Sequence, residues 1–292
     1  MIRGFILKGI AGTYVVRTKK GNFTCEITGK IKFEDDRPIV GDFVLIEVIN
    51  PEEKLAMIAE ILPRKTQLHR PKVSNVSQAV IVFALKNPDP HLHLLDHIIT
   101  FVEYSGLKTL ICFNKADIDD DQLVDDYRRI YEAIGYTVIV TSTKSEQGKE
   151  ELTKALKNEI SVFAGPSGVG KSSLLNMIQP NLQLKTGEIS EKIKRGKHTT
   201  RHTELISLKK GGWVVDTPGF ANLDISFIKE ENLSQYFKEI NKWGHQCKFN
   251  NCMHTNEPKC VVKKKLEAKE MTRSRYDSYV LILKEIRENR RF

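Results

Sequence analysis

The segment "VFAGPSGVGKSSLLNMI", residues 162 to 178, constrains the fold of this chain more than any other stretch. It contains a complete phosphate-binding loop of the form G-x-x-x-x-G-K-S, placed between a short apolar run and a helical pattern. This order predicts a strand, a tight glycine-rich turn and a helix whose first N–H groups face an anion. The segment therefore predicts an α/β domain with a nucleoside triphosphate site at the carboxyl end of its strands.

The residue types in this loop match the roles that phosphate binding requires. Gly165 and Gly170 let the backbone approach phosphate without a Cβ clash. Lys171 is expected to reach the β- and γ-phosphates and to act in catalysis, and Ser172 to ligate Mg²⁺. The predicted nucleotide-contacting residues of this stretch are Gly165, Pro166, Ser167, Gly168, Val169, Gly170, Lys171, Ser172 and Ser173.

A second motif, "ICFNKAD" at residues 111 to 117, follows an apolar strand pattern and lies upstream of the phosphate loop. The Asp117 carboxylate can accept hydrogen bonds from guanine N1–H and N2–H₂, whereas adenine offers neither donor. A site built around such a polar group rejects the wrong base strongly. Ser142, in "TSTK" after the next strand, is placed to support the base. The predicted guanine-binding residues are Asn114, Lys115, Ala116, Asp117 and Ser142, which makes GTP and GDP the expected ligands.

The motif "DTPG" at residues 216 to 219 has the D-x-x-G pattern. Asp216 is expected to hold Mg²⁺ through water, and the Gly219 amide to meet the γ-phosphate. Between the phosphate loop and Asp216 lies the basic stretch "RGKHTTRHTE". Either Thr199 or Thr200 in this stretch is placed to complete the magnesium shell, and the sequence does not choose between them.

The residue after Gly219 is Phe220, where many GTP-hydrolysing proteins carry the glutamine that orients the attacking water. A phenyl ring cannot orient water, so we expect slow intrinsic hydrolysis. His198, beside the two threonines, is the candidate catalytic residue for this task. The alternative is that His198 is an exposed loop residue or an RNA contact.

The order of these motifs is base reader, support loop, phosphate loop, threonine switch and D-x-x-G. A ligand site in an open α/β sheet needs these loops in space and not in one chain order. The order therefore predicts a circularly permuted GTPase domain. One consequence is that the switch segments lead directly into the C-terminal region.

The segment "CKFNNCMHTNEPKC" places four metal-ligand residues, Cys247, Cys252, His254 and Cys260, within 14 positions. Three thiolates and one imidazole are typical of a closed, tetrahedral structural zinc site. A polar loop of this kind has little core of its own, so the metal would supply folding energy. His245 is a nearby competitor for the histidine position. Cys25 and Cys112 lie alone in strand-like runs and are predicted core residues.

The regions on either side of the nucleotide motifs have different patterns. Residues 1–66 contain short alternating strands separated by glycines, which favours an OB-type β-barrel that binds RNA or serves as structural support. Residues 55–62 fit either a strand or a helix, and residues 64–77 fit a linker or a docking strip. We predict three domains: the barrel at 1–66, the permuted GTPase domain at 67–225 and a helical zinc domain at 226–292.

The net charge of +9 is concentrated in two short segments. Residues 185–202 carry six basic and two acidic groups, and residues 261–292 carry ten and five. Local excess of this kind suits a phosphate-backbone partner, although a solvated basic face has the same composition. No apolar run approaches the roughly 20 residues that span a bilayer, so we expect a cytoplasmic protein without disulfides.

These motifs together resemble one family, the circularly permuted, small-ribosomal-subunit-dependent GTPases called RsgA or YjeQ. The resemblance covers the barrel, "NKAD", "GPSGVGKSS", "HTT", "DTPG" and the cysteine cluster. It implies a factor in late maturation of the small (30S) subunit that binds rRNA, acts as a monomer and is stimulated by that subunit. Two rivals remain at this stage: an RNA-binding module in which GTP hydrolysis is incidental, and a P-loop ATPase or small-molecule kinase.

Overall fold

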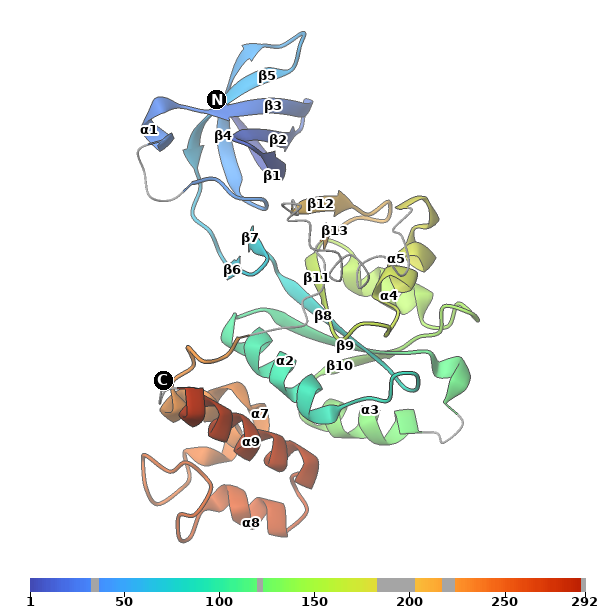
Figure 1. Cartoon of the computed structure of the whole chain (residues 1–292), viewed down its shortest axis with the longest axis vertical. Coiled ribbons are helices and arrows are strands. Elements are labelled where there is room, and N and C mark those ends of the chain that lie inside the picture. Colours follow the sequence, from blue (N-terminus) through green and yellow to red (C-terminus); the bar gives the residue numbers. More distant parts are fainter. Residues whose placement is uncertain (33–36, 120–122, 183–202, 217–223, 290–292) are drawn as a thin grey trace. The chain divides into compact units, whose positions relative to one another are not determined.

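The computed structural model describes residues 1–32, 37–119, 123–182, 203–216 and 224–289 (Figure 1). The chain divides into two compact units, each built from segments that are far apart in the sequence. The first unit comprises Met1–Ala79, Lys149–Phe163 and Ser172–Phe220, and the second comprises Val80–Gly148, Ala164–Lys171 and Ala221–Phe292.

A closed five-stranded barrel forms the N-terminal part of the first unit. Its strands are β1 (Ile2–Ile10), β2 (Thr13–Thr18), β3 (Gly21–Ile27), β4 (Phe43–Asn50) and β5 (Leu55–Ile61), with a short helix α1 (Gly29–Lys32). The strand order is β1-β2-β3-β5-β4, and β4 pairs back onto β1. Along β3 the residues Phe23 and Cys25 are buried while Thr24 and Glu26 are exposed, as the alternation predicts. The barrel prediction is confirmed, and residues 55–62 contain a strand.

The first unit also contains a sheet that continues from the barrel. Strand β1 pairs with β12 (Glu204–Ser207), which runs antiparallel to β13 (Trp213–Asp216). Strand β13 in turn pairs in parallel with β11 (Ile160–Ala164). The helix α4 (Lys149–Leu156) precedes β11, and the helix α5 (Lys171–Ile178) and the 3₁₀ helix η2 (Pro180–Leu182) lie between β11 and β12 in the chain. The sequence analysis did not predict β12, because a four-residue run carries too little periodicity to identify.

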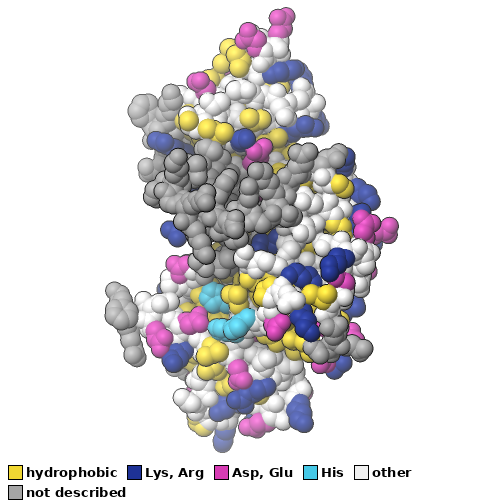
Figure 2. All heavy atoms as spheres, turned by 45° about the vertical axis from the view of Figure 1, so that its right-hand side comes forward, with side chains coloured by type: hydrophobic (Ala, Val, Ile, Leu, Met, Phe, Trp, Pro, Cys, Tyr) yellow, Lys and Arg dark blue, Asp and Glu magenta, His cyan; other side chains and the backbone are white. Residues whose placement is uncertain are grey.

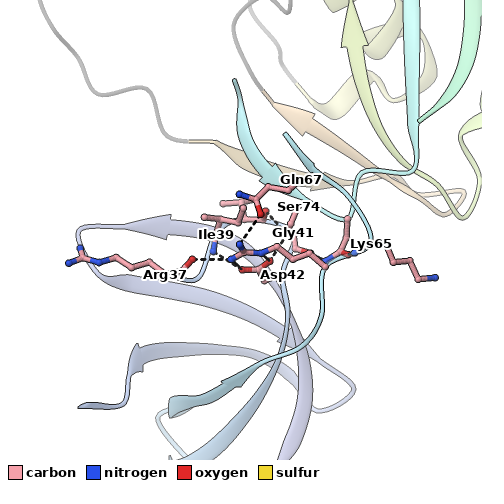
Figure 3. A network of polar contacts seen from close by, with 10 residues as sticks. Arg37, Ile39, Gly41, Asp42, Lys65, Gln67 and Ser74 are labelled. Atoms are coloured by element: carbon pink, nitrogen blue, oxygen red, sulfur yellow. Dashed lines mark hydrogen bonds and ion pairs between the residues drawn. The ribbon is translucent and has the colours of Figure 1, made fainter. Parts of the chain in front are cut away.

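A hairpin after the barrel, β6 (Gln67–His69) and β7 (Lys72–Ser74), is joined to the barrel by a buried carboxylate, Asp42 (Figure 3). Arg64 donates from Nε to Asp42 Oδ1 at 2.7 Å and from Nη2 to Oδ2 at 2.8 Å. The Ser74 hydroxyl donates to Oδ1 at 2.6 Å, and the Ile39 amide donates to Oδ2 at 2.8 Å. Of the two alternatives for residues 64–77, the docking strip matches these contacts.

The second unit contains a three-stranded layer with helices packed on it, in which the last two strands along the chain run parallel. Strands β8 (Gln78–Ala84), β9 (Lys108–Asn114) and β10 (Thr137–Val140) lie in the order β10-β9-β8, with the helices α2 (Leu92–Tyr104) and α3 (Leu123–Ala133). Every residue of β8 is buried, which is typical of a strand covered on both faces. Leu95, Ile99 and Val102 of α2 are buried, at the spacing that places side chains on one face of a helix.

The C-terminal helices form a core of their own within the second unit. They are η4 (Glu230–Tyr236), α7 (Lys238–Gly244), α8 (Val261–Glu267) and α9 (Arg273–Asn289). Phe237, Ile240, Tyr279 and Ile282 are among the residues buried there. None of the helices in the described parts of the chain combines the length and the apolar character needed to cross a membrane.

One buried cation, Arg275 of α9, joins these helices to the three-stranded layer. Its side chain is 1% exposed, and its Nη1 lies 2.6 Å from Asp96 Oδ1 on α2. Its Nε lies 2.7 Å from Glu239 Oε1 on α7. The Tyr131 hydroxyl of α3 donates to the same Asp96 oxygen at 2.8 Å. Four helices therefore share one ion network in which each charge has an opposite partner, as buried charges require.

Candidate nucleotide and metal sites

The predicted phosphate loop lies between β11 and α5, and its glycines stand where no other residue fits. Gly165 has φ +128°, and a Cβ there would lie 2.1 Å from the Val82 carbonyl oxygen. Gly170 has φ +97°, and a Cβ there would lie 2.3 Å from Asn114 Nδ2. Real Cβ atoms do not approach so closely, so the loop needs glycine at both ends for its path and for its packing.

The Lys171 side chain folds back onto the phosphate loop. Its Nζ donates to the carbonyl oxygens of Gly165, at 2.8 Å, and Pro166, at 2.7 Å. Burial lowers the pKa of the Lys171 ammonium to about 8, because desolvation disfavours the charged form. A bound phosphate would stabilise the ammonium far better than neutral carbonyls do. The geometry suits the predicted role of Lys171 as the phosphate-binding cation.

The base-reading loop is tied to the phosphate loop through Asn114. Its side chain is buried, and its Nδ2 donates to the Val169 carbonyl at 2.8 Å. Its Oδ1 accepts a hydrogen bond from the Thr141 hydroxyl at 3.0 Å, and the Ala116 amide donates to the Thr141 carbonyl at 3.1 Å. Three loops from separate strands therefore meet at one amide. The sequence predicted that Asn114 belongs to the site, but not that it connects the loops.

Two side chains of the neighbouring loop hold the Asp117 carboxylate in position. Ser142 Oγ donates to Oδ1 at 2.6 Å, and Lys144 Nζ lies 3.2 Å from Oδ2. The hydrogen bond from Ser142 holds the pKa of the Asp117 carboxyl below its usual value, and Lys144 adds to this effect. At neutral pH the group is thus an ionised, acceptor-only carboxylate, which is the form that a guanine edge requires.

We expect Asp117→Asn to weaken guanine-nucleotide binding by about 100-fold, since it replaces two charge-assisted acceptors worth about 1.5 kcal/mol each. Xanthine nucleotides should bind this variant better than the original chain does, because xanthine carries an oxygen where guanine has its 2-amino group. Titration of both nucleotides against both proteins measures the exchange. Unchanged guanine affinity in the variant would remove Asp117 from the base-reading role.

The other predicted nucleotide residues are placed only in part. Lys115 of the base-reading loop has φ +63°, and its Nζ donates to the Asn87 carbonyl, so the loop contacts the segment after β8. Ser172 and Ser173 lie in the first turn of α5. Ser167 and Gly168 lie in the loop itself, where Gly168 has φ +80°. His198, Thr199, Thr200, Gly219 and Phe220 lie outside the described residues.

Asp216 is the last residue of β13 and stands opposite Glu204 of β12. Burial raises the pKa of the Asp216 carboxyl, and the neighbouring Glu204 carboxylate raises it further. A divalent cation would reverse both effects, because it stabilises the ionised form. This environment is compatible with the predicted role of Asp216 beside magnesium.

The four predicted metal ligands converge in the second unit. One ligand atom from each of Cys247, Cys252, His254 and Cys260 lies within 4.8 Å of all the others. The two sulfurs of Cys247 and Cys260 are 3.9 Å apart, and they lie 3.6 and 3.5 Å from His254 Nδ1. A tetrahedral zinc with bonds of about 2.0–2.3 Å needs ligand separations of roughly 3.3–3.8 Å. The cluster therefore fits a structural zinc ion.

The position of His245 and the ionisation of the cluster residues both support the assignment of His254 as the fourth zinc ligand. His245 is exposed, and its Nδ1 faces the Asn241 carbonyl at 3.4 Å, so it is not part of the cluster. Burial raises the pKa of the Cys252 thiol to about 12 and lowers that of His254. A cation at the centre would stabilise the thiolates and the neutral imidazole together.

Three side chains outside the ligand set hold the metal-ligand loop in place through hydrogen bonds to its backbone. They were not predicted from the sequence. The Tyr276 hydroxyl donates to the His254 carbonyl at 2.8 Å, and Tyr279 donates to the Met253 carbonyl at 3.0 Å. The Glu257 carboxylate accepts the amides of Met253 and Thr255 at 2.8 and 2.9 Å. Glu257 lies inside the cysteine segment, so its position two to four residues from those amides was the only signal in the sequence.

Comparison with known families agrees with the motif order. The family model described as "RsgA GTPase" matches residues 61–226, and the model described as "RsgA N-terminal domain" matches residues 3–56. The first match alone covers more than half of the chain. The chain belongs to the RsgA GTPase family.

Relatives of the RsgA family match the chain over its whole length. A protein of Alkaliphilus metalliredigens (strain QYMF) named "Small ribosomal subunit biogenesis GTPase RsgA" is 49% identical over 292 residues, covering 100% of both chains. The crystal structure of YjeQ from Thermotoga maritima matches with a TM-score of 0.86 and 37% identity, covering 98% of each chain. The structure of YloQ, described as a circularly permuted GTPase, matches with a TM-score of 0.84 and 35% identity, covering 99% of this chain and 96% of that one. The predicted permuted GTPase fold is confirmed, and the chain is a GTPase, which excludes the ATPase and kinase readings.

Proposed function

We propose that this chain hydrolyses GTP as a factor in the biogenesis of the small ribosomal subunit, and that contact with the subunit's rRNA accelerates hydrolysis. The observation that carries the proposal is full-length similarity to a relative whose name states small-subunit biogenesis. Because its partner would be ribosomal, we expect the protein to act in the cytoplasm. We expect it to be a monomer built from a barrel (1–66), a GTPase domain (67–225) and a zinc domain (226–292).

In the proposed nucleotide site each residue has one task. Asp117 and Ser142 read and support guanine, Lys171 binds the β- and γ-phosphates, and the glycine loop supplies backbone N–H donors. Mg²⁺ would be held by Ser172, by Asp216 through water and by Thr199 or Thr200. The cation supplies charge neutralisation on the phosphates. The cluster of Cys247, Cys252, His254 and Cys260 would hold one structural zinc.

The charge distribution over the C-terminal helices supports an RNA contact next to the metal cluster. Several cations of α9 are already paired with carboxylates: Arg273 with Asp277, Lys284 with Glu288, and Arg275 within its buried network. By contrast, no carboxylate in the described parts of the chain forms an ion pair with any of five lysines around the cysteine segment. These are Lys242, Lys248, Lys259, Lys263 and Lys264, which we call the lysine group.

The cysteine cluster brings the chain segments of two members of the lysine group together. Lys248 follows Cys247 and Lys259 precedes Cys260, and these two cysteine sulfurs are only 3.9 Å apart. Phe249, which is 41% exposed, lies under the Lys248 ammonium at 5.7 Å, so an aromatic surface for base stacking lies among the charges. Figure 2 shows Lys and Arg side chains at the lower end of the view, where α8 lies in Figure 1. The lysine group therefore joins basic residues of α8 to basic residues of the cysteine loop, which precedes the segment 261–292.

Stimulation by the subunit is expected because the chain lacks the usual water-orienting glutamine. Phe220 follows the D-x-x-G motif, and the segment 185–202 carries a net charge of +4. RNA phosphates can attract this segment, and docking could then bring His198 or an rRNA group to the attacking water. Hydrolysis would thus be coupled to arrival on the subunit.

The test is GTP turnover by the full-length protein with and without isolated 30S subunits, 50S subunits and 70S ribosomes. We expect slow turnover alone and several-fold or greater acceleration by 30S only. The acceleration should need more 30S as salt rises, since neutralising phosphates releases counterions. A 30S series that gives no acceleration at low salt would contradict the proposal.

A parallel series with His198→Ala tests the histidine. Loss of stimulation with unchanged 30S affinity would support a catalytic role for His198. Full stimulation would leave the proposed function standing and assign water orientation to another group, such as the rRNA.

A further inference from the structure

The barrel is connected to both ends of the strand that carries Asp216, directly at one end and through β12 at the other. At the start of β13, the Trp213 ring packs edge-on against Phe5 of β1, with ring centroids 5.6 Å apart. At the other end, β12 lies between the barrel and β13. Lys8 of β1 stands opposite Glu204 of β12 in the strand pairing, and Glu204 stands opposite Asp216. Lys8 Nζ lies 2.8 Å from Glu204 Oε2. A four-residue strand is thus connected to the barrel through its first and its last residue.

The Asp216 end of β13, where the D-x-x-G motif begins, belongs to a row of three charged residues. Residues directly opposite each other in antiparallel strands project from the same face of a sheet. Lys8, Glu204 and Asp216 are directly opposite in two successive antiparallel pairings, so they form a row with the signs plus, minus and minus. Two facing carboxylates repel each other. Lys8 offsets this repulsion and holds Glu204 toward β1.

The barrel end of this row is firmly attached. The Ile6 amide donates to the Asp42 carbonyl and the Gly41 amide donates to the Ile6 carbonyl, both at 2.9 Å. The Asp42 side chain in turn accepts a hydrogen bond from Arg64. It also accepts one from Ser74 (Figure 3). Lys8 stands two residues beyond Ile6. A displacement of the barrel would therefore move Lys8 with it.

We propose that Lys8 is a positioning residue of the GTPase reaction, which sets the place of Asp216 through Glu204 and passes the effect of barrel docking to the nucleotide site. The inference rests on the proposed stimulation by the subunit. The Lys8 and Glu204 side chains are 34% and 43% exposed, so their ion pair contributes little to folding stability. Its role is to fix a geometry, and its loss should leave the fold intact.

The experiment compares Lys8→Met, which keeps the apolar stem, with Lys8→Arg, which keeps the charge. Turnover of the full-length protein is measured alone and at saturating 30S, together with the melting temperature. We expect Lys8→Met to lower the stimulated rate about fivefold or more, the low end of typical coupling between sites. Melting should match the original chain, basal turnover should fall by less than the stimulated rate does, and Lys8→Arg should retain most of the stimulation. Lys19→Met, on an exposed barrel lysine, is the matched control.

A double-mutant cycle identifies the route. In a Glu204→Gln background, Lys8→Met should have no further effect, because the charge on which Lys8 acts is gone. Equal stimulation of Lys8→Met and the original chain overturns the inference and leaves the proposed function intact. A loss that disappears at saturating 30S also overturns it, since Lys8 would then contact the RNA directly. If 30S fails to stimulate the original chain, the proposed function fails, and the inference fails with it.

Discussion

Replacing Lys171 with alanine is expected to lower GTP turnover by about 1,000-fold, the upper range for removing one preorganised donor to a developing charge. The ammonium is held between two loop carbonyls, at 2.8 and 2.7 Å, so it is in place before the nucleotide arrives. Among the described residues of the loop it is also the sole cation. Single-turnover hydrolysis, with nucleotide binding measured separately, assigns the loss to binding or to chemistry.

The matched control for this variant is Lys154→Ala, which removes an exposed lysine from α4. We expect it to retain full turnover. Lys171→Arg adds a further test, because a guanidinium keeps the charge but does not fit the compact space between the two carbonyls. Turnover in Lys171→Ala within tenfold of the original chain would contradict the phosphate-loop assignment.

Cys252→Ala is expected to remove one zinc ion per chain and to unfold the C-terminal helices at temperatures where the original chain is folded. Structural zinc contributes an apparent free energy of about 10–16 kcal/mol in small metal-dependent domains. In this chain Cys252 and Cys260 lie within the same buried cluster as Phe237, Tyr279 and Ile282, so loss of the metal would disturb the whole helical core. Elemental analysis gives the metal content, and thermal unfolding gives the stability.

Two controls separate the metal from general damage. Cys25→Ala changes a buried thiol in the barrel, and His245→Ala changes the exposed histidine nearest to the cluster. Both should keep one zinc per chain. A chelator should lower the melting temperature of both to that of Cys252→Ala. Protein purified without chelator that contains no metal, yet melts as expected for the folded chain, would rule out the zinc site.

The parts of the site that could be predicted from the sequence are those encoded in short contiguous motifs. The phosphate loop, the Asn114–Asp117 loop and the cysteine cluster each place their ligands within a few residues, so spacing alone identifies the chemistry. The strands of the sheet were predictable because a buried strand is apolar along nearly its whole length, as residues 79–84 of β8 are.

The contacts that connect the parts could not be predicted in the same way. Lys8 and Glu204 are 196 positions apart, and Arg275 and Asp96 are 179 apart. No local sequence pattern identifies such pairs. An arginine in an amphipathic helix is predicted to be a solvent-exposed charge until its partners are known. The hairpin at residues 67–74 was missed for a related reason: its two strands have three residues each, too few to show alternation.

The Arg275 network limits how this protein can be taken apart. A shortened chain ending near residue 225, at the edge of the matched GTPase segment, would keep Asp96 and Tyr131 but remove the cation that pairs with Asp96. Removing one partner of a buried ion pair costs about 3–5 kcal/mol, a large share of the 5–15 kcal/mol that stabilises a typical domain. The C-terminal helices therefore cannot be removed without destabilising the rest of the second unit. A truncated enzyme, or a chimera that takes these helices from a relative, should fold well only if both halves of the network are transferred together.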